Sequence, residues 1–235
     1  MPTRTEAEEH LRVIRSLMEK ATIYRAISAP TALVGGVLSV AAAAALCFAF
    51  PRSTNGDELS RQAPWFVGIW FAVLVLTLTA NTYFLWRGAQ KRNAPFFSSG
   101  MRLALRATRP GLLCGLYFTV MFGVSDSFGP AGYYMFYLPP LWMIFYALGL
   151  LATFHFAPRS IAHLGWAFLA AGMISFCLII TDELEPFFSA ANNLITGTSA
   201  VMNVLMAATF GFFHLIYAAS TWPRKVKQGD TGVTP

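Results

Sequence analysis

The sequence predicts an all-α, polytopic integral membrane protein with six transmembrane helices, preceded by a cytoplasmic amphipathic helix. Three observations predict this class: the composition, the long apolar runs and the distribution of positive charge. Of the 235 residues, 56% are hydrophobic and 12% are charged, about half the charged fraction of a soluble globular chain, and the mean hydropathy is +0.53. Because so few charges could not cover a soluble surface, we expect lipid to be the solvent.

Residues 1–25 are charged and read as a separate amphipathic helix that begins at a Thr5/Glu8 capping box. Its apolar residues recur at helical spacing, at Leu11, Ile14, Met18 and Ala21. Such a helix lies on the membrane, packs under the bundle or binds a partner. The apolar run that follows is too long for a signal-peptide core, so we expect it to be retained as the first span.

Six apolar runs approach the roughly 20 residues needed to cross the hydrocarbon core. The third run is short, at 110–125, but it lengthens backward through arginines whose side chains can reach the headgroups. Backbone groups in lipid must pair within their own segment, and strand alternation is absent, so we expect helices. The predicted membrane domain, 26–223, has spans at 26–50, 63–86, 106–125, 132–157, 160–181 and 195–222.

The positive charges sort to one side of these spans. Fifteen of the 17 Lys and Arg residues precede the first apolar run, follow the sixth, or lie between the second and third runs or the fourth and fifth. The other side has only Arg52 and Arg61. Because cationic loops stay in the cytoplasm, we expect both termini there, including a disordered tail at 224–235. The compact loops favour a bacterial inner membrane.

Three histidines lie toward the cytoplasmic ends of predicted spans: His155, His163 and His214. Imidazoles at similar depth can hold a metal or a haem iron. Their spacing matches no metal-binding motif. We therefore expect packing or hydrogen bonding, with no metal and no cofactor, and keep a histidine-ligated metal or haem as an alternative.

The fourth predicted span contains Pro139 and Pro140, which remove two backbone donors and should kink or break the helix. Tyr137 precedes them, and Asn203 lies near the middle of the sixth span. Pro-kinked aromatic helices occur at gates and pockets as well as at simple bends. A mid-span Asn makes either an interhelical hydrogen bond or a contact with a ligand or pore. Together these residues would form the site of a small-solute transporter or channel.

Unpaired acids gather on the predicted outer side, at Asp126, Asp182, Glu183 and Glu185. Outer loops that avoid Lys and Arg accumulate such acids without any function. The same carboxylates would also form a shallow vestibule that concentrates cations. Both interpretations stay open.

The basic segment 87–109 carries Arg102, Arg106 and Arg109 at spacings of four and three, so they form one stripe on a helix. Cations near an anionic leaflet attract its headgroups. We expect this stripe to contact anionic lipid on the cytoplasmic side, with an acidic protein partner or a nucleotide as the alternative. No nucleic-acid-binding module accompanies the charge.

Catalytic signatures such as GxSxG, a Walker loop or GxGxxG are missing from the sequence. No charged residue lies in the central part of a span, where ion-coupled transporters commonly have one. The sequence therefore favours a non-enzymatic membrane protein that scaffolds or regulates a partner through residues 1–25 or 87–109. The alternatives are a small-solute transporter or channel and a redox membrane subunit.

Overall fold

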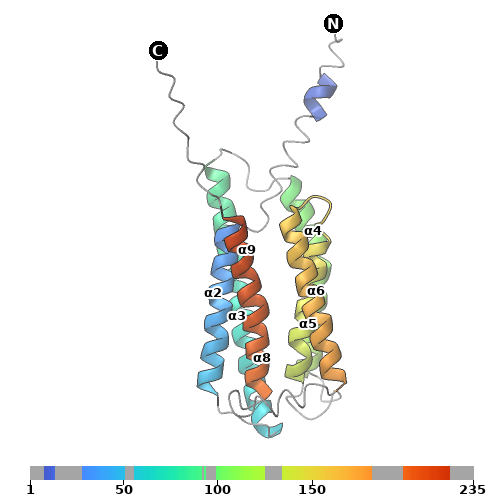
Figure 1. Cartoon of the computed structure of the whole chain (residues 1–235). Helices are drawn as coiled ribbons and strands as arrows, with labels where there is room; N and C mark the ends of the chain where they lie inside the picture. Colours follow the sequence, from blue (N-terminus) through green and yellow to red (C-terminus); the bar gives the residue numbers. More distant parts are fainter. Residues whose placement is uncertain are drawn as a thin grey trace.

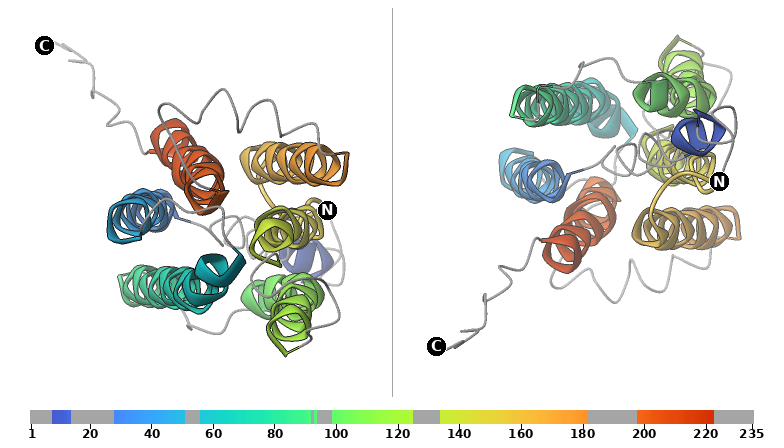
Figure 2. Two further views of the ribbon diagram at one scale, coloured as in Figure 1. Left: turned by 90° about the horizontal axis from the view of Figure 1, so that it is seen from below. Right: turned by 90° about the horizontal axis from the view of Figure 1, so that it is seen from above.

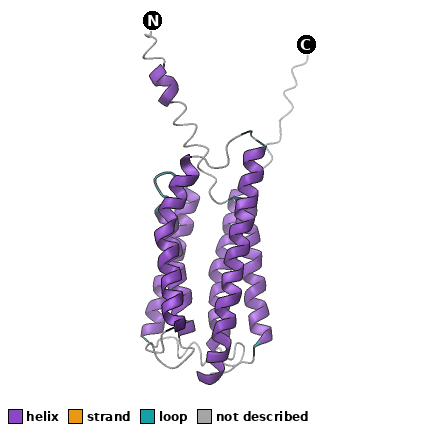
Figure 3. Ribbon diagram, turned by 180° about the vertical axis from the view of Figure 1, so that it is seen from behind, coloured by secondary structure: helices purple, strands orange, loops and turns teal. Residues whose placement is uncertain are grey.

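A computed structural model of the chain describes residues 8–13, 28–50, 56–91, 93, 99–124, 134–181 and 198–222. These residues form helices joined by turns, with no strand among them (Figure 3), which confirms the all-α class. A short helix occupies residues 8–13. The long helices are α2 (Ala29–Ala49), α3 (Gly56–Gln90), α4 (Ser99–Val124), α5 (Tyr134–Leu151) and α6 (Arg159–Ile180). Then α8 (Thr198–Met206), the π-helix η2 (Ala207–Phe213) and α9 (His214–Thr221) follow without a break.

Four helical segments are long and apolar enough to cross a membrane: Ala29–Ala49, Ser60–Gln90, Arg159–Ile180 and Ala200–Thr221. A shorter apolar segment is Phe136–Leu151. Helix α4 is long enough, but three arginines in its first half leave only a short uncharged part. By length and composition, these helices are compatible with a membrane protein.

Local sequence explains where several helices begin and end. At the start of α2, the Ser28 side chain accepts a hydrogen bond from the Thr31 backbone N–H at 3.3 Å, and a proline occupies the first turn. Pro158 precedes α6. Helix α5 was expected to kink or break at Pro139 and Pro140, and it continues through both prolines without a break. Both prolines fall in its second turn, so the missing N–H groups cost hydrogen bonds near the helix start and not in its middle.

The helices run alongside one another (Figure 1) and form two groups of three. In the first group α2 is the middle helix, packed against α3 on one side and α8–η2–α9 on the other. In the second group α5 is the middle helix, between α4 and α6. Figure 2, which looks along the helices, shows the two groups side by side. Helices α5 and α6 contact the α8–η2–α9 helix and so join the groups.

Glycines set the spacing within each group. A methyl group at Gly111 of α4 would lie 2.5 Å from the Phe145 carbonyl oxygen of α5, and one at Gly172 of α6 would lie 3.0 Å from the Pro140 carbonyl oxygen. In the first group, a methyl group at Gly211 of η2 would lie 2.7 Å from Val40. The backbones approach this closely only because these side chains are absent.

Large side chains fill the space between the groups, in two clusters. The near cluster lies toward the end where α2 begins, and the far cluster lies toward the opposite end. The near cluster comprises Ala32, Met143, Ala147, Leu150, Ile161, Leu164, Phe168, Tyr217 and Ala218. The far cluster comprises Ala43, Leu46, Ala63, Phe66, Trp70, Met202 and Met206. Both groups contribute to the near cluster; at the far cluster, the second group adds the partly buried Phe136, Trp142 and Ile179.

Candidate functional site

An ionisable side chain, His214, lies in the near half of the bundle and is only 8% exposed. It is the first residue of α9, directly after the π-helix. Its Nδ1 lies 2.8 Å from the Phe210 carbonyl oxygen, and its Nε2 lies 2.8 Å from the Tyr146 hydroxyl of α5. Because a carbonyl oxygen can only accept, Nδ1 carries the hydrogen, and in the neutral ring Nε2 accepts from the Tyr146 O–H.

Aromatic rings enclose this pair. The Phe168 ring of α6 lies 4.9 Å from the Tyr146 ring and 5.4 Å from the imidazole, measured between centroids. The Phe210 ring stacks on the imidazole at 6.3 Å. The pair therefore connects the two helix groups in an apolar setting, where few polar groups compete with its hydrogen bond. π-Helical turns are rare and are found frequently at functional sites, and an ionisable residue inside a membrane domain is a candidate for function.

Two side chains in the far half of the bundle, on α8 and α3, each place a buried polar atom where it has no hydrogen-bond partner among the described residues. These atoms are Oδ1 of Asn203, whose residue is 3% exposed, and Nε1 of Trp70, whose residue is 5% exposed. One is an acceptor and the other a donor. Trp70 belongs to the far cluster, and Asn203 lies beside Met202 of the same cluster. A buried polar atom without a partner costs stability. This part of the interior therefore contains one acceptor and one donor that are free to form a hydrogen bond.

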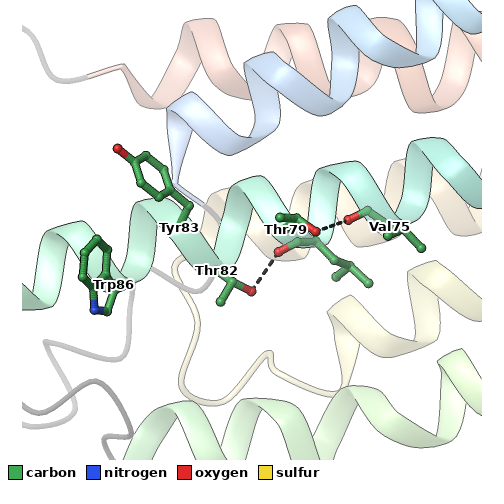
Figure 4. Close-up of a pocket in the computed structure, with 6 residues that line it drawn as sticks. Val75, Thr79, Thr82, Tyr83 and Trp86 are labelled. Atoms are coloured by element: carbon green, nitrogen blue, oxygen red, sulfur yellow. Dashed lines mark hydrogen bonds between the residues drawn. The ribbon is translucent and has the colours of Figure 1, made fainter.

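A shallow groove runs along one face of α3 (Figure 4). It is lined by Val75, Leu78, Thr79, Thr82, Tyr83 and Trp86. The Thr79 and Thr82 hydroxyls donate to the carbonyl oxygens of Val75 and Leu78, each at 2.8 Å. Because both hydroxyls bond within their own helix, the groove presents mainly methyl groups and aromatic rings.

The three histidines are not brought together. His155 and His163 are exposed, whereas His214 is buried with both ring nitrogens hydrogen-bonded. Within the described part of the chain, no group of three His, Cys, Asp or Glu side chains is placed to hold a metal ion.

Pro139 and Pro140 are buried, and Gly172 of α6 packs against the Pro140 carbonyl oxygen. The Tyr137 ring lies against Phe122 of α4 and Phe176 of α6, at centroid distances of 6.3 Å and 6.4 Å. These residues thus pack within the second group, whereas Asn203 belongs to the first.

Arg102, Arg106 and Arg109 are all exposed along α4. The acids Asp126, Asp182, Glu183 and Glu185 lie outside the described residues, as does most of 1–25. Every residue of the short helix 8–13 is exposed, with Leu11 at 65%.

Sequence reasoning placed His214 toward the cytoplasmic end of the sixth span and expected packing or hydrogen bonding there. It did not identify Tyr146 as the partner, and it did not single out Trp70. A sequence holds no direct sign of either, because both depend on which helix faces meet. A search of protein-family models found no match, and neither curated proteins nor solved structures gave one. The fold and interior define a helical membrane protein with a packed core, and its function must be argued from its own residues.

Proposed function

We propose that this chain is a six-span protein of the bacterial inner membrane, with both termini in the cytoplasm, that acts by binding and regulating a partner protein. Six spans are supported by α2, α3, α4, α5, α6 and the continuous α8–η2–α9 helix. Helix α4 serves as the third span if its three exposed arginines extend to the headgroups. The sorting of positive charge supports the orientation.

One observation carries the proposal: large side chains fill the interior, while uncovered apolar side chains lie outside. Phe66, Met143 and Phe168 are each at most 1% exposed. The Phe66 ring stacks on Trp142 of α5 with centroids 6.0 Å apart, closing the space between the two groups in the far half. A solute path would need to displace these rings, so transport has weaker support than association.

The surfaces available to a partner lie at the predicted cytoplasmic end. In the helix 8–13, Leu11 and Val13 are 65% and 52% exposed, and no described part of the chain covers them. An apolar residue on a charged helix binds either a partner or the membrane surface. The exposed arginines of α4 offer a second surface with the opposite chemistry, for an acidic segment.

A deletion tests the proposal. Protein lacking residues 1–22 should stay folded in the membrane but lose partner proteins recovered after mild cross-linking in cells. Leu11→Asp should produce most of this loss, because it removes the exposed apolar side chain, whereas Glu9→Gln on the same short helix should not. An unchanged set of cross-linked proteins in the deletion variant would refute the proposal.

A further inference from the structure

The groove on α3 has the length of one membrane leaflet. From Val75 to Trp86 the helix advances eleven residues, which is about 16 Å at 1.5 Å per residue. Half the hydrocarbon thickness of a bilayer is about 15 Å. The groove occupies the half of α3 that ends at Gln90, on the side expected to face the cytoplasm. The part of an acyl chain nearest the headgroup would therefore fit along the apolar stretch Val75–Thr82, which is about 10 Å long.

Along the groove, apolar side chains are followed by aromatic rings, in the same order as the acyl chain and the headgroup region of a phospholipid. Val75, Leu78 and the two threonines, with their hydroxyls bonded to the helix, form the apolar part. Tyr83 and Trp86 follow, with ring centroids 6.3 Å apart and about half of each side chain exposed. Aromatic rings of this kind favour the headgroup level.

Two cations continue the same stripe. Arg87 is four residues beyond Tyr83, and Lys91 is four beyond Arg87, so all three share one face of the helix. Both cations are exposed, and neither forms an ion pair within the part of the chain that the structure describes. A phosphate at the end of the groove would therefore meet two unpaired positive charges.

The groove faces the outside of the bundle. Helix α3 packs mainly on α2, and Figure 2 shows α3 at a corner of the two groups. Leu78 is 47% exposed and Val75 45%, so a membrane lipid can reach the groove without any change in the fold.

We propose that this groove binds one anionic phospholipid of the cytoplasmic leaflet, with an acyl chain on Val75–Thr82 and the phosphate between Arg87 and Lys91. The inference rests on the orientation given under the proposed function. A second copy of α3 would fit less well, because a two-fold axis along the membrane normal places equal depths together. Arg87 and Lys91 would then face the same cations of the partner.

Lipid retention tests the site directly. The full chain is placed in nanodiscs containing phosphatidylcholine and phosphatidylglycerol, and native mass spectrometry counts the lipids that remain bound on release. Wild-type protein should retain one phosphatidylglycerol in preference to phosphatidylcholine. Arg87→Gln and Lys91→Gln should each weaken this retention about fivefold, whereas Arg159→Gln, an exposed cation on α6, should not.

A second pair of variants tests the acyl contact. Thr79→Phe fills the groove and should abolish selective retention, while Leu76→Phe adds the same ring at an exposed position of α3 outside the groove lining and should not. Equal retention in Thr79→Phe and Leu76→Phe would overturn the proposal. So would loss of self-association in Thr79→Phe with lipid retention unchanged, because a second copy would then occupy the groove.

Both lipid tests read binding in the purified protein, whichever way it faces and without any partner. Failure of lipid retention therefore leaves the partner experiment unaffected. Failure of the cross-linking experiment in turn leaves the lipid result standing.

Discussion

His214 and Tyr146 show how one side-chain pair specifies the contact between two helix groups. Each side chain is an aromatic ring that carries a polar group at its edge. The hydrogen bond between the Tyr146 hydroxyl and Nε2 of His214 buries these two polar groups against each other. Phe168 and Phe210 then surround the bond with rings. Removing one of the two polar groups leaves the other buried without a hydrogen bond, which costs stability. Removing both leaves an apolar contact between the helices.

A double-mutant cycle measures this pair. Tyr146→Phe leaves Nε2 of His214 buried without a donor and should lower the free energy of unfolding by about 0.6 to 2 kcal/mol. Combining it with His214→Leu should cost less than the two single changes added together. Unfolding in mixed detergent micelles gives these energies, and Tyr117→Phe at an exposed tyrosine of α4 is the control. Strictly additive losses would contradict the account.

Single residues were also the hardest feature to predict from sequence. Asn203 was expected to make either an interhelical hydrogen bond or a contact with a ligand or pore, and its amide oxygen is buried without a hydrogen-bond partner. The metal-binding alternative required three histidines to converge. That depends on helix rotation, and rotation is set by contacts that a hydropathy pattern does not contain.

Among the helices, close approach within each group depends on a few glycines. Helix α4 packs mainly on α5, and its closest point is Gly111 over the Phe145 carbonyl oxygen. Gly111 and Gly115 lie four residues apart, a spacing of small residues that permits close packing of helices. The structure shows that α5 approaches Gly111 more closely than Gly115, since a methyl group at Gly115 would meet its nearest atoms at 3.9 Å.

This inequality gives a prediction for α4. Gly111→Ala should push α4 away from α5 and destabilise the bundle by about 1 to 3 kcal/mol. Gly123→Ala, on the same helix but with no atom within 4 Å of the new methyl group, should be neutral or slightly stabilising because alanine favours helix. Thermal unfolding in detergent compares the two variants. Equal stability of both would show that α4 is not held at Gly111.

The helical type of the elements followed from the sequence because backbone groups in lipid must pair within their own segment. The number of six spans stays a prediction, since four described helices are long and apolar enough to cross a membrane and a fifth apolar helix is shorter. Spans expected at 26–50 and 160–181 correspond to α2 at Ala29–Ala49 and α6 at Arg159–Ile180. The π-helix at Ala207–Phe213 was not anticipated, since its residues are compatible with an ordinary α-helix. The fourth span was expected to kink or break at its prolines, and their place in the second turn lets α5 continue without a break.

At the scale of the whole molecule, large side chains fill the interior, and the proposed binding surfaces lie on the outside. Both clusters are closed by side chains from the two groups. The groove on α3, the arginine stripe of α4 and the helix 8–13 all lie toward the end of the bundle that the charge distribution predicts to be cytoplasmic. Partner and lipid would then meet the protein on one side of the membrane, which makes orientation the central claim.

Thiol accessibility in intact cells tests that orientation most directly. In a background with the three native cysteines replaced by alanine, single cysteines are introduced as Leu11→Cys, Arg61→Cys and Lys91→Cys, all at exposed positions. A membrane-impermeant reagent should label only Arg61→Cys until the membrane is opened, after which all three should react. Labelling of Leu11→Cys and Lys91→Cys from opposite sides of the membrane would contradict the six-span arrangement.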